Sequence, residues 1–175
     1  MKNLVMLLLV GLATISCSKD DTPAEAAITD PNTMKIYNKT TGEEIKNGDI
    51  VVLTSKITPN NKLSFYIKNI TSSPMNVKSR LVSMANTDGT GMSFCIGQTC
   101  FYSVTAGSSY PSNSETLTVP ANGTAGSDGT FKMENTVSPD GGAANLDYVF
   151  EFYQYDGNGN EVGNKVSFTY RYTGS

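Results

Sequence analysis

In Leu146-Asp-Tyr-Val-Phe-Glu-Phe-Tyr153, every second residue from Leu146 is a large apolar or aromatic side chain, and the residues between them are mixed in character. Val166-Ser-Phe-Thr-Tyr-Arg-Tyr172 alternates in the same way, with polar residues in between. The turn sequence Asp156-Gly-Asn-Gly-Asn160 lies between them. A period of two is typical of strands with one buried face, so the pattern predicts an antiparallel hairpin. Burial of each ring contributes roughly 1.5–3 kcal/mol. We therefore expect this hairpin to form the centre of the core.

The chain upstream of the hairpin repeats this pattern in shorter pieces. Lys62–Ile70 alternates cleanly, and Met75–Met84 alternates with a change of parity that predicts a β-bulge near Ser79–Arg80. The consecutive apolar residues Ile50–Leu53 suggest a strand that is covered on both faces or bulged. No helical period occurs after residue 30. The expected fold is an all-β, antiparallel, immunoglobulin-like β-sandwich of about eight or nine strands, with a barrel as the alternative.

The N-terminus has the features of a signal peptide. Lys2 supplies a positive charge, and Leu4–Leu12 is apolar but too short to span a bilayer, which takes about 20 residues. Small residues lead up to Cys17, and this placement resembles a bacterial lipobox. The resemblance implies cleavage after residue 16 and a diacylated Cys17. A plain secretory peptide is the alternative.

The residues after Cys17 bear on location. Ser18, Lys19, Asp20 and Asp21 resemble the export signal of Bacteroidota surface lipoproteins, which implies an outward-facing position on the outer membrane. An ordinary charged tether is the alternative. We therefore divide the chain into a lipoprotein signal peptide (1–16), a lipidated flexible tether (17–30) and a β-sandwich domain (31–175).

Composition excludes several functions. The chain has no histidine, which rules out Ser-His-Asp and Cys-His nucleophiles and histidine metal sites. Its net charge of −3 argues against nucleic acid as a partner. The turn at residues 156–160 departs from a calcium loop at Glu161 and Ser167, so we read it as a hairpin turn and expect no metal and no cofactor. A hydrolase that uses carboxylates alone stays open.

Cys95 and Cys100 are the two cysteines left once Cys17 is lipidated. An even pair in an oxidising compartment predicts a disulfide. A redox or soft-metal dithiol is the alternative, although redox pairs usually have two intervening residues rather than four.

The stretch Phe94-Cys-Ile-Gly-Gln-Thr-Cys-Phe101 loosely resembles a hairpin of immunoglobulin-like modules in Bacteroidota secreted proteins. This resemblance implies a fold and a lineage, and no activity.

Five tyrosines are expected to be exposed: Tyr66, Tyr102, Tyr110, Tyr153 and Tyr155. We single out Tyr102 and Tyr110 as candidates for ligand contact, with ordinary rim tyrosines as the alternative.

These features predict a non-enzymatic, surface-anchored lipoprotein that binds a protein or glycan through loops or an exposed sheet face. The alternative is a structural or accessory subunit of an outer-membrane transport or secretion complex. The expected partners are the membrane, through the lipid anchor, and an unknown ligand, with no nucleic acid.

Overall fold

The C-terminal hairpin forms the two longest strands of one sheet, β12 (Leu146–Tyr155) and β13 (Glu161–Tyr172). The computed structural model describes residues 32–54, 61–112 and 115–174. Within them, the large side chains that alternate along the hairpin are almost fully buried: Leu146, Tyr148, Phe150, Phe152, Phe168, Tyr170 and Tyr172. The prediction that this hairpin lies at the centre of the core is confirmed.

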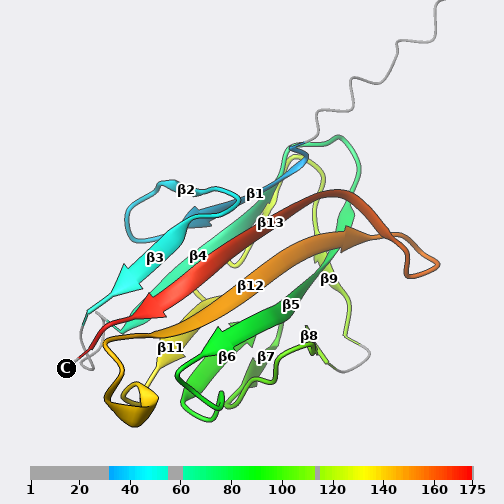
Figure 1. The fold of residues 1–175 in the computed structure, drawn as a ribbon. Helices are drawn as coiled ribbons and strands as arrows, with labels where there is room; N and C mark the ends of the chain where they lie inside the picture. Colours follow the sequence, from blue (N-terminus) through cyan, green and yellow to red (C-terminus); the bar gives the residue numbers. More distant parts are fainter. Residues whose placement is uncertain (1–31, 55–60, 113–114, 175) are drawn as a thin grey trace, which may run out of the picture.

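Two sheets pack face to face (Figure 1). The β12 sheet contains, in spatial order, β3 (Ile50–Leu53), β13, β12, β5 (Met75–Ala85) and β8 (Ser109–Tyr110), with β9 (Leu117–Val119) also on β5. The second sheet, called the β1 sheet, contains β2 (Glu44–Ile45), β1 (Met34–Asn38), β4 (Lys62–Asn69), β11 (Lys132–Asn135), β6 (Met92–Ile96) and β7 (Thr99–Phe101), with β10 (Thr124–Ala125) also on β4. A single turn of 3-10 helix, η1 (Asp140–Gly142), precedes β12. The predicted all-β sandwich is confirmed.

Aromatic rings from both sheets meet in the core. The Phe65 ring of β4 lies 5.4 Å from the Phe152 ring of β12, and the Phe94 ring of β6 lies 4.8 Å from that of Phe150. Such pairs contribute about 0.5–1.5 kcal/mol beyond the burial of their surface. The inward side of each sheet is thus committed to packing, which leaves the outer faces, edges and loops for function.

The strand count and one pairing differ from the prediction. Thirteen strands lie in the described part of the chain, more than the expected eight or nine, because short strands such as β8 and β10 also form. All pairs are antiparallel except β3 with β13, which is parallel. β3 is an edge strand with Ile50 and Val52 half exposed, and its register with β13 is continuous. The expectation that this apolar run is covered on both faces or bulged is therefore wrong.

The bulge in β5 lies at Val82 rather than at Ser79–Arg80. Ser83 pairs with Val149 and Leu81 with Phe150, which leaves Val82 without a partner on β12. The extra residue turns Val82 to solvent and restores Met84 to the inner side, where it packs against the core.

Asn164 of β13 ties the beginning of β1 to the other sheet. Its side-chain oxygen accepts hydrogen bonds from the Met34 N–H (2.9 Å) and the Thr33 hydroxyl (3.0 Å), and its amide donates to the Met34 carbonyl (2.9 Å). The side-chain amide thus replaces a strand partner for Met34. These bonds position β1, which carries part of the candidate site described below.

No helix in the described ranges has the length and apolar character that a bilayer crossing requires.

Candidate functional site

The predicted lipidation and export residues lie outside the described residues. Cys17, Ser18, Lys19, Asp20 and Asp21 all precede Asn32, where the description begins. The signal peptide and tether therefore stay predictions from the sequence.

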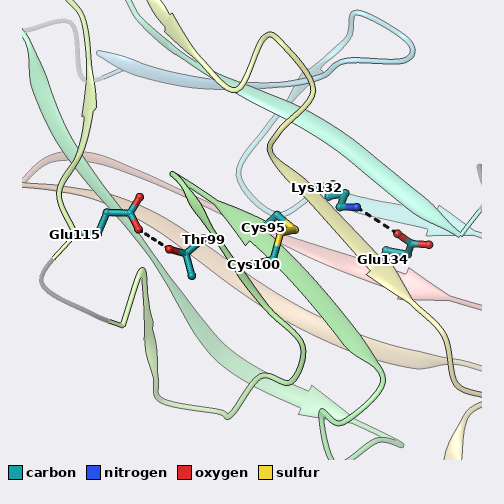
Figure 2. Close-up of a disulfide and its surroundings, with 6 residues drawn as sticks. All are labelled: Cys95, Thr99, Cys100, Glu115, Lys132 and Glu134. Carbon is teal, nitrogen blue, oxygen red and sulfur yellow. Dashed lines mark hydrogen bonds and ion pairs between the residues drawn. A yellow bond between two sulfur atoms is a disulfide. The ribbon is translucent and has the colours of Figure 1, made fainter.

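Cys95 and Cys100 form a disulfide between β6 and β7, as predicted (Figure 2). They are directly opposite in the antiparallel register, with an S–S distance of 1.99 Å and Cα atoms 4.0 Å apart. Cys95 is buried and Cys100 is exposed. Because the neighbouring Phe94 and Ile96 point into the core, the disulfide lies on the outer face of the β1 sheet.

Tyr102 and Tyr110 do not form a shared surface. Tyr102 is 77% exposed, as expected, but Tyr110 is only 4% exposed, so its predicted exposure is wrong. Tyr110 belongs to β8, and its ring packs against Phe94 and Phe101. Its hydroxyl accepts a hydrogen bond from the Thr105 N–H at 2.9 Å. Although the sequence around Tyr110 is polar, its ring is part of the core and covers one side of it.

Tyr153 is also buried, contrary to expectation. It lies on the outer side of β12, but the Arg80 guanidinium lies 5.1 Å from its ring centre and its hydroxyl donates to the Ser109 hydroxyl at 3.1 Å. Tyr66 and Tyr155 are half-buried.

The β1 sheet brings Tyr66 into contact with Tyr37. The two residues are directly opposite on β4 and β1, and their rings stack with centres 5.1 Å apart and planes 10° apart. Both point away from the core, because their neighbours Ile36, Phe65 and Ile67 are fully buried. Both rings are half-buried, so part of each stays accessible.

Lysines surround this tyrosine pair on the same outer face. One step along the strands Lys35 is opposite Lys68. In the other direction Lys132 of β11 is opposite Ser64 and also opposite Cys95, and Lys62 follows at the end of β4. We call this surface, made of Tyr37, Tyr66, Lys35, Lys62, Lys68 and Lys132, the tyrosine–lysine face.

The charges on this face are only partly compensated. Lys35 pairs with Glu44 at 3.2 Å, and Lys132 lies 3.8 Å from Glu134 (Figure 2). Within residues 32–54, 61–112 and 115–174, Lys62 and Lys68 make no ion pair. Four lysines against two carboxylates make this face positive, although the chain as a whole has a net charge of −3.

On the outer face of the β12 sheet, by comparison, both arginines are paired with carboxylates. Arg80 pairs with Glu151 and with Glu161, and Arg171 contacts both oxygens of Asp147 at 2.8 and 2.7 Å. The Arg171 guanidinium lowers the pKa of the Asp147 carboxyl. Asp147 and Glu151, two of the carboxylates that a carboxylate-only hydrolase could use, are thus each paired with an arginine.

A shallow depression of about 360 Å³ lies at the disulfide end of the tyrosine–lysine face. Its lining is about equally polar and apolar, and its walls include Lys62, Lys132, Gln98, Thr130 and the Cys95–Cys100 disulfide. Its volume falls within the range of small-molecule sites, roughly 300–1,000 Å³. Glu115 lies beside it and accepts a hydrogen bond from the Gln98 N–H at 2.6 Å. It also accepts one from the Thr99 hydroxyl at 2.8 Å (Figure 2).

A second feature is the free edge of β3. The Asp49 carbonyl accepts a hydrogen bond from Thr169 of β13, and the Leu53 carbonyl accepts one from Thr173, just after β13. The backbone groups of Ile50 and Val52 therefore point to the other side, where the described chain supplies no strand. An open groove of about 270 Å³ runs between this edge and β2, with Glu43, Glu44 and Asp49 among its walls.

Sequence reasoning missed Tyr37, Lys35 and Lys132. The alternation in the sequence places Lys35 and Tyr37 on one side of their strand, and Lys62, Tyr66 and Lys68 on one side of another. The missing information was the register that places these strands side by side.

No protein-family model matches this chain, and a comparison with curated proteins found no match. Among solved structures, the chain is similar to the N-terminal domain of PorA, with a TM-score of 0.48 and 17% sequence identity. The superposition covers 81% of this chain and 99% of that domain. This similarity is too low to transfer a function.

Proposed function

We propose that this protein is a non-enzymatic lipoprotein of the outer membrane, anchored through Cys17 and facing outward, which binds a ligand with the outer face of its β1 sheet. The observation that supports it most is the stacked Tyr37–Tyr66 pair among lysines. Paired tyrosines offer apolar ring surface together with hydroxyl groups, the combination that suits sugar and protein ligands. The lipid at Cys17 and the tether at residues 17–30 would hold this surface near the membrane.

The anchor is tested by metabolic labelling with an alkyne-tagged palmitate. We expect label on the wild-type protein and none on Cys17→Ala, with Cys100→Ala as the control that keeps Cys17. Label on both cysteine variants would contradict the anchor. Proteinase treatment of intact cells then tests orientation, because an outward-facing protein is degraded and an inward-facing one is protected.

The binding surface is tested with the mature lipoprotein in a non-ionic detergent on a glycan array. We expect the Tyr37→Ala/Tyr66→Ala double variant to lose binding. Tyr155→Ala, on the outer face of the other sheet, is the matched control and should bind as the wild type does. Equal binding by the double variant and the wild type would contradict this assignment.

A second candidate function is an accessory subunit of an envelope complex, and the free edge of β3 favours it. An edge strand with exposed apolar side chains and unpaired backbone groups is a template for a strand of another chain. A photo-crosslinking amino acid at Ile50 tests this role in cells. If the protein crosslinks to a specific partner and is protected from proteinase in intact cells, the accessory role replaces that of an outward-facing binding protein.

A further inference from the structure

We infer that the ligand of the tyrosine–lysine face is an acidic polysaccharide, whose sugar rings contact Tyr37 and Tyr66 and whose anionic groups are bound by Lys62, Lys68 and Lys132. This inference rests on the proposed function, since it names the ligand class of the same surface.

The first argument is the electrostatic cost of the free face. Lys35 and Lys68 are directly opposite on neighbouring strands, and like charges in that position destabilise a sheet. Lys35 has Glu44 beside it, but Lys68 has no ion-pair partner in the described part of the chain. An anion bound at this row would offset the repulsion. On the opposite sheet, by contrast, Arg80 and Arg171 are each paired with a carboxylate.

The second argument is the spacing of the cations. Lys68 and Lys62 lie at the two ends of the outward side of β4, about 20 Å apart at roughly 3.3 Å per residue. Tyr66 lies between them, and Lys132 flanks the Lys62 end. A single small anion cannot reach both ends. An extended polymer with repeated negative groups can, with its rings over the tyrosines.

The third argument concerns the depression beside the disulfide. It combines Lys62 and Lys132 with the side-chain amide of Gln98 and the hydroxyl oxygen of Thr130. The two nearby carboxylates are already engaged: Glu115 by the Gln98 N–H and the Thr99 hydroxyl, and Asp128 by the Thr130 hydroxyl. Ammonium groups recognise carboxylate or sulfate, and neutral amides and hydroxyls recognise sugar hydroxyls. Its volume of about 360 Å³ suits one acidic sugar of a longer chain.

Other occupants fit the surface less well. The cores of protein interfaces are depleted in lysine, whereas lysines occupy both ends of this face. Insertion into a membrane needs exposed apolar side chains, and the large ones in the described ranges, Ile50, Val52, Val82, Tyr102 and Val162, lie elsewhere. A polysaccharide satisfies both the charge and the polarity of the face.

The test uses the mature lipoprotein in a non-ionic detergent and two matched pairs of polymers. These are polygalacturonate against its fully methyl-esterified form, and dextran sulfate against dextran. We expect at least one charged polymer to bind at least about tenfold more tightly than its neutral partner, and the affinity to fall as salt is added.

Lys62→Gln/Lys68→Gln should weaken binding about tenfold. Lys46→Gln/Lys78→Gln, which changes the net charge equally, should leave the affinity within about twofold. Thermal unfolding of both variants checks that the fold is kept.

Each other outcome overturns the inference in a distinguishable way. Equal affinity for charged and neutral polymers, lost in Tyr37→Ala/Tyr66→Ala, would leave the proposed function standing and remove the acidic ligand. Equally tight binding to polyglutamate or to phosphatidylglycerol vesicles would show that charge alone is recognised. Binding to none of the polymers would remove the acidic polysaccharide, and the glycan-array and crosslinking results would then decide between the two proposed functions.

Discussion

The carboxylate of Glu115 lies so close to Gly97 that a Cβ added to this glycine would be 2.1 Å from Oε1. Gly97 has a φ of +66°, in the left-handed region that glycine adopts without strain. The absence of a side chain lets the carboxylate bond to the backbone of Gln98 and the hydroxyl of Thr99. Glycine at this position therefore allows Glu115, in the segment that leads into β9, to bind the β6–β7 hairpin.

Gly97→Ala should lower the free energy of unfolding by about 2–3 kcal/mol. The left-handed conformation costs about 1–2 kcal/mol for alanine, and displacement of Glu115 weakens charge-assisted hydrogen bonds. Urea unfolding followed by tyrosine fluorescence measures the loss. Gly159→Ala is the control, because its φ of +85° is also left-handed and nothing lies within 4 Å of an added Cβ there. A loss of the same size in both variants would contradict the role given to Glu115.

Removal of the disulfide should cost about 2 kcal/mol and leave the sandwich folded. The bond closes a loop between residues only five apart, and in the chain-entropy model short loops contribute least. Cys95→Ser/Cys100→Ser should therefore keep its β-sheet circular dichroism at 25 °C with a lower urea midpoint. A reducing agent should lower the wild-type midpoint to the same value. Complete unfolding of the variant would show that the disulfide does far more than join β6 to β7.

Tyr170→Phe and Tyr172→Phe should differ sharply, although both rings are fully buried. The Tyr170 hydroxyl donates to the Asn61 carbonyl at 2.6 Å and accepts from the Asn135 N–H at 3.0 Å. Without this hydroxyl, the Asn135 N–H and the Asn61 carbonyl keep only the 3.4 Å hydrogen bond between them. The free energy of unfolding should fall by about 1–3 kcal/mol. The buried Tyr172 hydroxyl has no hydrogen-bond partner in the described chain, so its removal should leave stability unchanged or higher. Equal losses in the two variants by urea unfolding would contradict this reading of the network.

Stability should fall as the pH rises above about 10. Burial raises the pKa of Tyr148, Tyr170 and Tyr172 above the ordinary tyrosine value of about 10. Above that pH the unfolded chain releases these protons while the folded chain keeps them. Each group then lowers the free energy of unfolding by up to about 1.4 kcal/mol per pH unit, and below pH 10 its contribution is fully present.

Tyrosinate absorbance measures this titration directly, since the chain has nine tyrosines and no tryptophan. We expect the last part of the titration, from Tyr148, Tyr170 and Tyr172, to coincide with loss of β-sheet circular dichroism. A single smooth titration of all nine tyrosines near pH 10, with the fold intact, would contradict the raised pKa values.

Local patterns predicted more of the fold than of the site. The alternation in Leu146–Tyr153 and Val166–Tyr172 identified the buried faces because a strand turns successive side chains to opposite sides. The spacing of Cys95 and Cys100 predicted their bond for a similar reason, since residues this close can be opposite each other across a hairpin. Ile50–Leu53 misled, because an apolar run does not reveal whether its strand is central or at an edge.

The sequence by itself determined the class of fold, the core hairpin, the disulfide and the expectation of a lipid anchor at Cys17, because each depends on residues that are neighbours in the chain. Only the tertiary structure decided that Tyr37 stacks on Tyr66, that Lys35 is opposite Lys68, and that Lys132 joins them from β11. It also decided that Tyr110 turns inward. The physical reason is that a period of two tells which face a side chain occupies but not which strand lies beside it. Strand order and register are set by packing between distant segments.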